Sequence, residues 1–269
     1  IPMGAGLSSS AAIECAVAFG LSHLYNLNID RATLAEIAQK AEHSFAGVLC
    51  GIMDQFASLL GKADNVIKLD CRSLDYEYVP LDLGDYKLVL LNTNVKHSLA
   101  SSEYNTRRMQ CSEGVHMVKE YFSEVKSLRD VTMSMLDRCV KQKDKEIYKR
   151  CKYIIEENSR LLQACEDLRQ GNLKALGHQL YLSHQGLSTE YEVSCSELDF
   201  LVRYVNPKKG VLGARMMGGG FGGCTINIVH EGAIDDLIKE TGNAYLQQMG
   251  KELTAYIVQT GNGTCIIHP

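Results

Sequence analysis

The 269-residue sequence lacks the features that mark three common classes of protein. Its 28 basic and 32 acidic residues give a net charge of −4 without a sustained basic stripe, which excludes the electrostatic footprint of a nucleic-acid binder. No apolar run approaches the ~18 residues of a membrane span, and no basic stretch followed by an apolar run marks a signal peptide. We therefore expect a soluble, cytoplasmic protein whose partner is a small molecule, not a nucleic acid or a membrane.

The ten cysteines lack the spacing that metal sites or redox motifs require. They are scattered singly, without a Cys-x-x-Cys pair or a Cys/His cluster, which favours reduced thiols in a cytoplasmic enzyme. A chain of this length holds one large or two modest domains, because domains commonly run to ~100–200 residues. We expect two lobes with a cleft between them.

Hydrophobic periodicity predicts helices, then strands, then helices, and finally strands and a helix again. The helix from Ser8 is apolar nearly all round, which predicts a buried helix, and Asp30 is a plausible N-cap for a second helix through Ala41. The basic cluster from Lys141 to Lys152 is predicted to be a solvated helix face. Strands are predicted at 65–69, 76–80, 86–92, 211–216, 225–229 and 253–258, and further helices at 51–60, over most of 101–204 and at 233–249. This order indicates an α+β fold with largely antiparallel sheet.

A glycine- and serine-rich segment leads directly into the first predicted helix: Gly4, Ala5, Gly6, Leu7, Ser8, Ser9 and Ser10. Its glycines allow the backbone to approach a ligand, and the N–H groups and dipole at the start of a helix suit a phosphate. One of the hydroxyls could also ligate Mg²⁺. The segment matches neither a Walker loop nor Gly-x-Gly-x-x-Gly, and from these residues alone an ordinary Ser-capped helix after a glycine turn is an equally good interpretation.

A second glycine run lies between two predicted strands, with five glycines among residues 218–223 and only Phe221 intervening. Ordering so many glycines costs backbone entropy, which favours a close backbone approach over a flexible hairpin tip. Asp54 follows Gly51 near the start of a helix, where a carboxylate could face a cleft. Taken alone, Asp54 is more often explained by the helix dipole, and Glu42 by an ordinary acidic surface position.

Five segments together resemble the galactokinases, a branch of the GHMP family of small-molecule kinases. They are PMGAGLSSSAA, AEHSFAGVLCGIMDQFAS, DCRSL, NVKHSLASSEYNTRR and MGGGFGGCT. The first and last are typical of the whole GHMP family, whereas CGIMDQF and HSLASSEY are more specific to galactokinases. The resemblance implies a two-lobed GHMP kinase fold with mixed or antiparallel sheets, in which residues 1–84 are the remainder of an N-terminal ATP- and sugar-binding domain and residues 85–269 are the C-terminal domain.

The resemblance also assigns roles to residues and implies ATP and Mg²⁺ as cofactors. Residues Gly4 to Ser10 become the triphosphate loop, with Ser10 and Glu42 as Mg²⁺ ligands. Asp54 becomes the catalytic base near the anomeric hydroxyl of the sugar, and Gly51 and Tyr104 hydrogen-bond the sugar. The glycine run, Gly218, Gly219 and Gly220 above all, packs against the triphosphate loop.

The implied reaction is ATP-dependent phosphorylation of α-D-galactose at its C1 hydroxyl, the first committed step of galactose metabolism. A kinase for another sugar, such as N-acetylgalactosamine or arabinose, and a non-catalytic galactose and ATP sensor are the alternatives. Galactokinases carry an upstream sugar-gripping motif resembling Arg-x-Asn-Leu-Ile-Gly-Glu-His-x-Asp-Tyr that these residues lack, and the sequence opens at Ile1. We therefore expect an N-terminal segment of the same protein to complete the site, and the isolated chain to bind sugar poorly and turn over slowly or not at all.

Overall fold

The computed structural model describes residues 6–95 and 100–267. Helices α1 (Ser9–Leu24), α2 (Arg31–Ala41) and α3 (Met53–Leu60), with the π-helical turn η1 (Glu42–Ala46), precede an antiparallel hairpin of β1 (Asn65–Leu69) and β2 (Tyr76–Pro80). The Asp30 carboxylate accepts the backbone N–H of Thr33 and caps α2, as predicted. A small core that includes Cys15, Leu34 and Phe56 joins the three helices.

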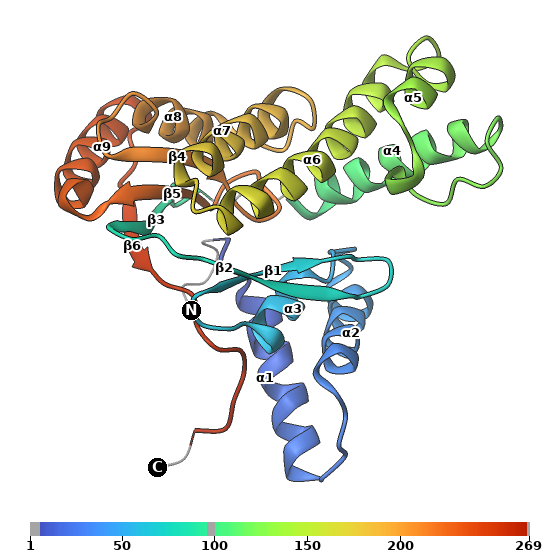
Figure 1. The fold of residues 1–269 in the computed structure, drawn as a ribbon, viewed down its shortest axis with the longest axis horizontal. Helices are drawn as coiled ribbons and strands as arrows, with labels where there is room; N and C mark the ends of the chain where they lie inside the picture. Colours follow the sequence, from blue (N-terminus) through green and yellow to red (C-terminus); the bar gives the residue numbers. More distant parts are fainter. Residues whose placement is uncertain (1–5, 96–99, 268–269) are drawn as a thin grey trace.

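Residues 86–258, called the second half of the chain from here on, contain a four-stranded sheet in the order β4-β5-β3-β6, and all its pairs are antiparallel, while residues 6–80 are called the first half. Its strands are β3 (Tyr86–Asn92), β4 (Val211–Met216), β5 (Cys224–His230) and β6 (Thr254–Val258). Figure 1 shows α7 (Leu173–Thr189), α8 (Ser196–Val205) and α9 (Ile234–Met249) on the side of this sheet turned away from α1, α2 and α3. A short 3₁₀ turn, η3 (Glu231–Ala233), leads into α9.

A helical arm extends from this sheet and is built of α4 (Ala100–Lys119), η2 (Leu128–Asp130), α5 (Met133–Cys139) and α6 (Lys145–Arg169) (Figure 1). Its own core includes Val118, Leu136 and Cys151. Contacts tie the arm and the chain end to the first half: Arg169 of α6 lies 2.9 Å from Glu77 of β2, and the N–H of Gly263 donates to the carbonyl of Gly61. The proposed division between residues 84 and 85 stays a prediction, since the segment after β6 packs back onto the end of α3.

The strands agree with the predictions to within one residue, and the α+β class with antiparallel sheets is confirmed. The prediction that the first helix is buried does not hold within the described residues, where Ile13 is 66% exposed and Leu24 is exposed as well. Its apolar residues occupy every face, but α2 and α3 pack only against the side that carries Ala11 and Cys15. Among the described residues, no helix is both long and apolar enough to cross a bilayer.

The predicted solvated face from Lys141 to Lys152 was wrong at one position. Lys141 is exposed, but Arg150 is 1% exposed. The Arg150 guanidinium pairs with the carboxylates of Glu146 and Glu192 and donates to the carbonyl of Glu190. A buried guanidinium needs such partners because an unpaired buried charge is costly.

Candidate active site

A cavity of about 440 Å³ opens between the first helices and the second half of the chain. It brings together most of the residues that the sequence singled out, although they come from five separate segments. Its lining includes Ser10, Glu42, Gly51, Asp54, Tyr104, Gly218, Gly219 and Gly220, together with Ala11, Val48, Cys50, Met53 and Gln55.

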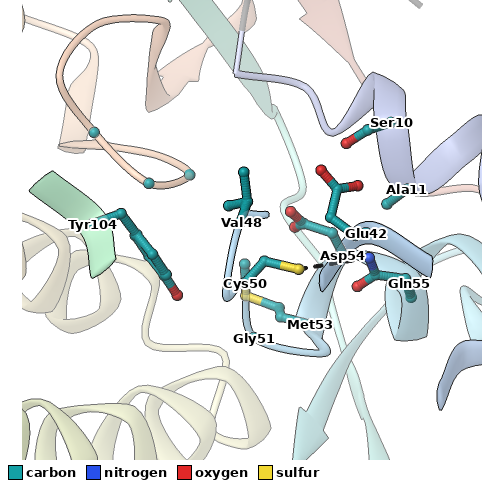
Figure 2. A pocket seen from close by; sticks show the side chains of 13 residues that line it. Ser10, Ala11, Glu42, Val48, Cys50, Gly51, Met53, Asp54, Gln55 and Tyr104 are labelled. Atoms are coloured by element: carbon teal, nitrogen blue, oxygen red, sulfur yellow. Dashed lines mark hydrogen bonds between the residues drawn. The ribbon is translucent and has the colours of Figure 1, made fainter. Parts of the chain in front are cut away.

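Figure 2 shows that the polar groups of this cavity face one another across it. The Ser10 hydroxyl and the carboxylates of Glu42 and Asp54 gather on one wall, and the Tyr104 ring stands on the opposite wall. Asp54 lies in the first turn of α3 and Glu42 opens the π-helical turn after α2, so local backbone geometry turns both carboxylates toward the start of α1. The arrangement leaves room for a ligand that touches both walls.

The predicted phosphate loop is described from Gly6 onward, while Gly4 and Ala5 lie outside the described residues. Gly6 has a φ of 70° and Ser8 a φ of 52°, so the chain enters α1 through left-handed backbone conformations. The Ser8 side chain makes no capping hydrogen bond to the helix. The alternative of an ordinary Ser-capped helix is therefore wrong, because the Ser8 side chain leaves the first-turn N–H groups uncapped.

The glycine run between β4 and β5 lies directly against this loop. A Cβ added at Gly6 would stand 3.5 Å from the Cα of Gly223, and one added at Gly218 would stand 3.4 Å from the carbonyl oxygen of Gly6. Gly218 and Gly220 also have φ values of 73° and 89°, which side chains rarely adopt. Close approach, rather than a flexible hairpin tip, accounts for these glycines.

Comparisons with known proteins agree with this geometry. Residues 1–62 match the model described as GHMP kinases N terminal domain, and residues 164–248 match the model described as GHMP kinases C terminal. The galactokinase of Thermotoga petrophila is 44% identical over 98% of this chain and 73% of its own length, and that of Clostridium perfringens is 43% identical over 98% and 68%. The structure of Lactococcus lactis galactokinase complexed with galactose superposes with a TM-score of 0.93 at 38% identity, over 98% of this chain and 68% of that one. The chain belongs to the galactokinases of the GHMP kinase family.

A more distant likeness concerns the fold alone. Mevalonate kinase from L. major superposes with a TM-score of 0.57 at 21% identity. The α+β architecture is thus shared with this mevalonate kinase, whereas the likeness in sequence is to galactokinases.

The donor groups of the cavity fit a magnesium ion accompanied by a nucleotide. The Oε2 atom of Glu42 is buried and has no hydrogen-bond partner among the described residues, and Ser10 lines the same cavity. Those residues contain no cluster of three or more His, Cys, Asp or Glu side chains able to hold a metal alone. Because Mg²⁺ is commonly held by one or two carboxylates plus substrate phosphates and water, one carboxylate and one hydroxyl are a sufficient protein contribution.

Two further residues went unnoticed in the sequence: Gln55, which lines the cavity, and Glu14, which contacts Gln55 from α1. Glu14 lies one turn beyond Ser10 on α1, and burial together with the adjacent Glu42 carboxyl raises the pKa of Glu14 to about 7. Gln55, which is 1% exposed, donates from its Nε2 to the Glu14 carboxyl at 3.4 Å. The i, i+4 spacing of Ser10 and Glu14 could have placed both on one helix face, but the contact with Glu42 requires the tertiary fold.

The opposite wall presents a protonated phenol. Burial raises the pKa of Tyr104, and the nearby backbone N–H of Gly51 opposes that rise. The hydroxyl keeps its own proton to donate, so Gly51 and Tyr104 form one polar patch in the cavity. The sequence predicted both as sugar contacts, and the structure brings them together.

Proposed function

We propose that this chain binds galactose and ATP in the cavity between α1, α3, α4 and the glycine run, and transfers the γ-phosphoryl group to the C1 hydroxyl of the sugar. The products are galactose 1-phosphate and ADP. The observation that carries the proposal is the meeting of Asp54, Glu42 and Ser10 on one cavity wall, opposite Tyr104 and beside the loop at Gly6.

The sugar end of the reaction depends on Asp54, Gly51 and Tyr104. Gly51 and Tyr104 hold sugar hydroxyls, which places the C1 hydroxyl near the Asp54 carboxylate. As the oxygen of that hydroxyl forms its bond to phosphorus and the bond from phosphorus to the ADP oxygen breaks, Asp54 accepts the hydroxyl proton. A positioned base of this kind contributes typically ~10²–10⁴-fold to the rate.

The nucleotide end depends on backbone groups rather than on side chains with unusual chemistry. Amides of the loop that enters α1, strengthened by the helix dipole, bind the phosphates, and the glycine run keeps this loop in place. Ser10 and Glu42 would hold Mg²⁺, which neutralises charge that develops on the phosphoryl oxygens. Positioning and charge stabilisation then supply most of the catalysis.

The test is sugar-dependent ADP release by a preparation that contains any upstream segment of the same protein, measured with galactose, N-acetylgalactosamine and arabinose in parallel. Asp54→Asn should lower the galactose-dependent rate by about a hundredfold or more while leaving affinity for an ATP analogue within about threefold, because the base touches the acceptor and not the nucleotide. Asp75→Asn, an exposed position in the turn between β1 and β2, is the matched control and should leave both unchanged.

Three results would contradict parts of this proposal. An Asp54→Asn rate equal to that of the parent would remove Asp54 from the role of base. Faster turnover of another sugar would replace the substrate. Tight binding of galactose and ATP without product, in a preparation that contains any upstream segment of the same protein, would favour the non-catalytic sensor.

A further inference from the structure

A buried histidine, His184, hydrogen-bonds the backbone at the start of the glycine run. His184 of α7 is 6% exposed, and its Nδ1 accepts the backbone N–H of Met216 at 3.1 Å. Its Nε2 lies 3.2 Å from an oxygen of Asp199 on α8. A neutral ring with its proton on Nε2 satisfies both contacts at once. Met216 is the last residue of β4, so this contact fixes the chain where it enters the run.

The same carboxylate anchors a second part of the run through the segment between α7 and α8. Asp199 accepts hydrogen bonds from the hydroxyls of Ser188 at 2.9 Å and Ser194 at 2.5 Å, which fixes this segment at both ends. Within it, the carbonyl oxygen of Val193 accepts the backbone N–H of Phe221 at 2.8 Å. The Asp199 carboxylate is therefore connected to the run at two points: through His184 to Met216, where the run begins, and through the segment with Val193 to Phe221, in its middle.

Asp199 is suited to this role because it stays an acceptor. Burial would raise the pKa of Asp199, but the hydrogen bonds from His184, Ser194 and Ser188 outweigh burial and bring it below its usual value. An ionised carboxylate offers two oxygens and no donor, and here one oxygen serves His184 and Ser194 while the other serves Ser188.

We infer that His184 and Asp199 are positioning residues for the nucleotide: they hold the glycine run against the loop at Gly6 and so shape the phosphate site without touching the ligand. This inference rests on the proposed function of that loop. A run of five glycines has little intrinsic preference for one conformation, so its position must come from outside contacts. Because Gly218 lies against the carbonyl of Gly6, a displaced run moves the loop.

The consequence is selective for the nucleotide. Of the three residues proposed to contact the sugar, Asp54 and Gly51 belong to α3 and the segment before it, which the contacts of His184 and Asp199 do not reach. Only Tyr104 lies beside the run, at Gly219. Loss of the His184 or Asp199 contacts should therefore weaken nucleotide binding more than sugar binding. General destabilisation would instead weaken the binding of both ligands in proportion to the unfolded fraction.

The variants are chosen to separate positioning from packing. His184→Leu removes both contacts, and Asp199→Ala removes the shared acceptor. His184→Gln keeps an oxygen that can accept and an amide that can donate. His178→Leu, at an exposed position of the same helix, is the matched control.

Two measurements are made on the full chain: hydrogen–deuterium exchange of amides 217–223, and dissociation constants for a non-hydrolysable ATP analogue with Mg²⁺ and for galactose. For His184→Leu and Asp199→Ala we expect exchange in 217–223 to rise about tenfold and the nucleotide dissociation constant to rise about tenfold, as for loss of a buried hydrogen bond. The galactose constant should change less than about twofold, and His184→Gln should restore much of the loss. Combining His184→Leu with Asp199→Ala should cost less than the sum of the two single changes.

Unchanged exchange in 217–223 for folded His184→Leu, or an equal loss of nucleotide and galactose affinity, would overturn the inference. If His184→Leu does not fold, His184→Gln and Asp199→Ala decide by the same two readouts. The exchange measurement needs no ligand, so it stands apart from the proposed function. If the variants exchange faster but the unsubstituted protein binds no nucleotide, both the kinase proposal and the selective effect on nucleotide binding are refuted. If the unsubstituted protein binds nucleotide and the variants exchange no faster, only the present inference is refuted.

Discussion

Replacing Gly220 by alanine tests the close packing on which the phosphate loop depends. Gly220 has a φ of 89°, and an added Cβ would overlap the carbonyl oxygen of Val193 and stand 3.0 Å from its carbonyl carbon. The neighbouring Gly219 has no such restriction: its added Cβ would meet only the Tyr104 ring, at 3.6 Å, which is ordinary contact. The two alanine variants thus add the same methyl group at adjacent positions with opposite steric outcomes.

The expected cost of Gly220→Ala follows from two contributions. A non-glycine residue in a left-handed conformation costs roughly 1–2 kcal/mol. Forcing a methyl group against an immobile backbone carbonyl costs about 1–3 kcal/mol more, as for other overpacked sites. Gly220→Ala should therefore lower the free energy of unfolding by about 2–5 kcal/mol, or move the run away from Val193 and break the Phe221 hydrogen bond.

Urea unfolding and binding of an ATP analogue with Mg²⁺ measure the two outcomes. Gly219→Ala should stay within about 0.5 kcal/mol of the parent in stability. Gly220→Ala should show a lower unfolding midpoint, weaker nucleotide binding, or both. Equal stability and equal nucleotide affinity for the two variants would refute the packing argument and, with it, the claim that the run shapes the loop.

Two other predictions concern the acidic groups. Glu14→Leu should weaken binding of Mn²⁺ with an ATP analogue by about tenfold, because it removes the polar group beside the proposed metal ligand Glu42. Glu14→Gln keeps a polar group there that can donate to a carboxylate and should stay within about threefold. Equal losses in electron paramagnetic resonance titrations would show that the charge of Glu14 matters and not its capacity to donate. Burial acts to raise the pKa of Glu197, but hydrogen bonds from Lys251 and Ser196 bring it to about 2, below its usual 4.5. This pair should stabilise the fold above pH 4.5 and lose that effect as the pH falls toward 2, so the stability difference between the parent and Lys251→Met should be constant near neutral pH and vanish in acid. A difference that persists at pH 2 in thermal unfolding would contradict that linkage.

The elements of the fold could be predicted from local sequence because their signals are local. Runs such as 86–92 and 211–216 are rich in apolar residues and bounded by glycine, aspartate or lysine, and the structure places strands there. Their pairing could not be predicted in the same way. β3 follows the β1–β2 hairpin in sequence but pairs with β5 and β6, across more than 130 residues, because its apolar residues complete the other core.

Burial was the weakest inference from periodicity. An apolar residue such as Ile13 is buried only if another element packs on its side of the helix, and α2 and α3 cover the other side. Arg150 shows the reverse error, since a charged residue in a basic cluster is buried once four hydrogen-bond partners surround it. The type of a side chain sets its tendency to be buried, whereas the packing of neighbouring elements decides whether it is buried.

The site was partly predictable for a similar reason. Ser10 and Asp54 stand at helix starts within distinctive motifs, so their positions could be located before any tertiary contact was known. Glu14, His184 and Asp199 carry no local signal, because each acquires its role from a residue 15 or more positions away. Motifs therefore identify groups that touch the ligand more readily than the groups that hold them.

The position of His184 and Asp199, which hold the glycine run, explains how the two halves of the chain share one site. Ser10, Glu42 and Asp54 belong to the first half, whereas Tyr104 and the glycine run belong to the second. The proposed phosphate loop lies in the first half, yet the backbone that lies against Gly6 is held by α7 and α8. Since positioning supplies most of the catalysis in phosphoryl transfer, the proposed reaction depends on the two halves of the chain keeping their relative position.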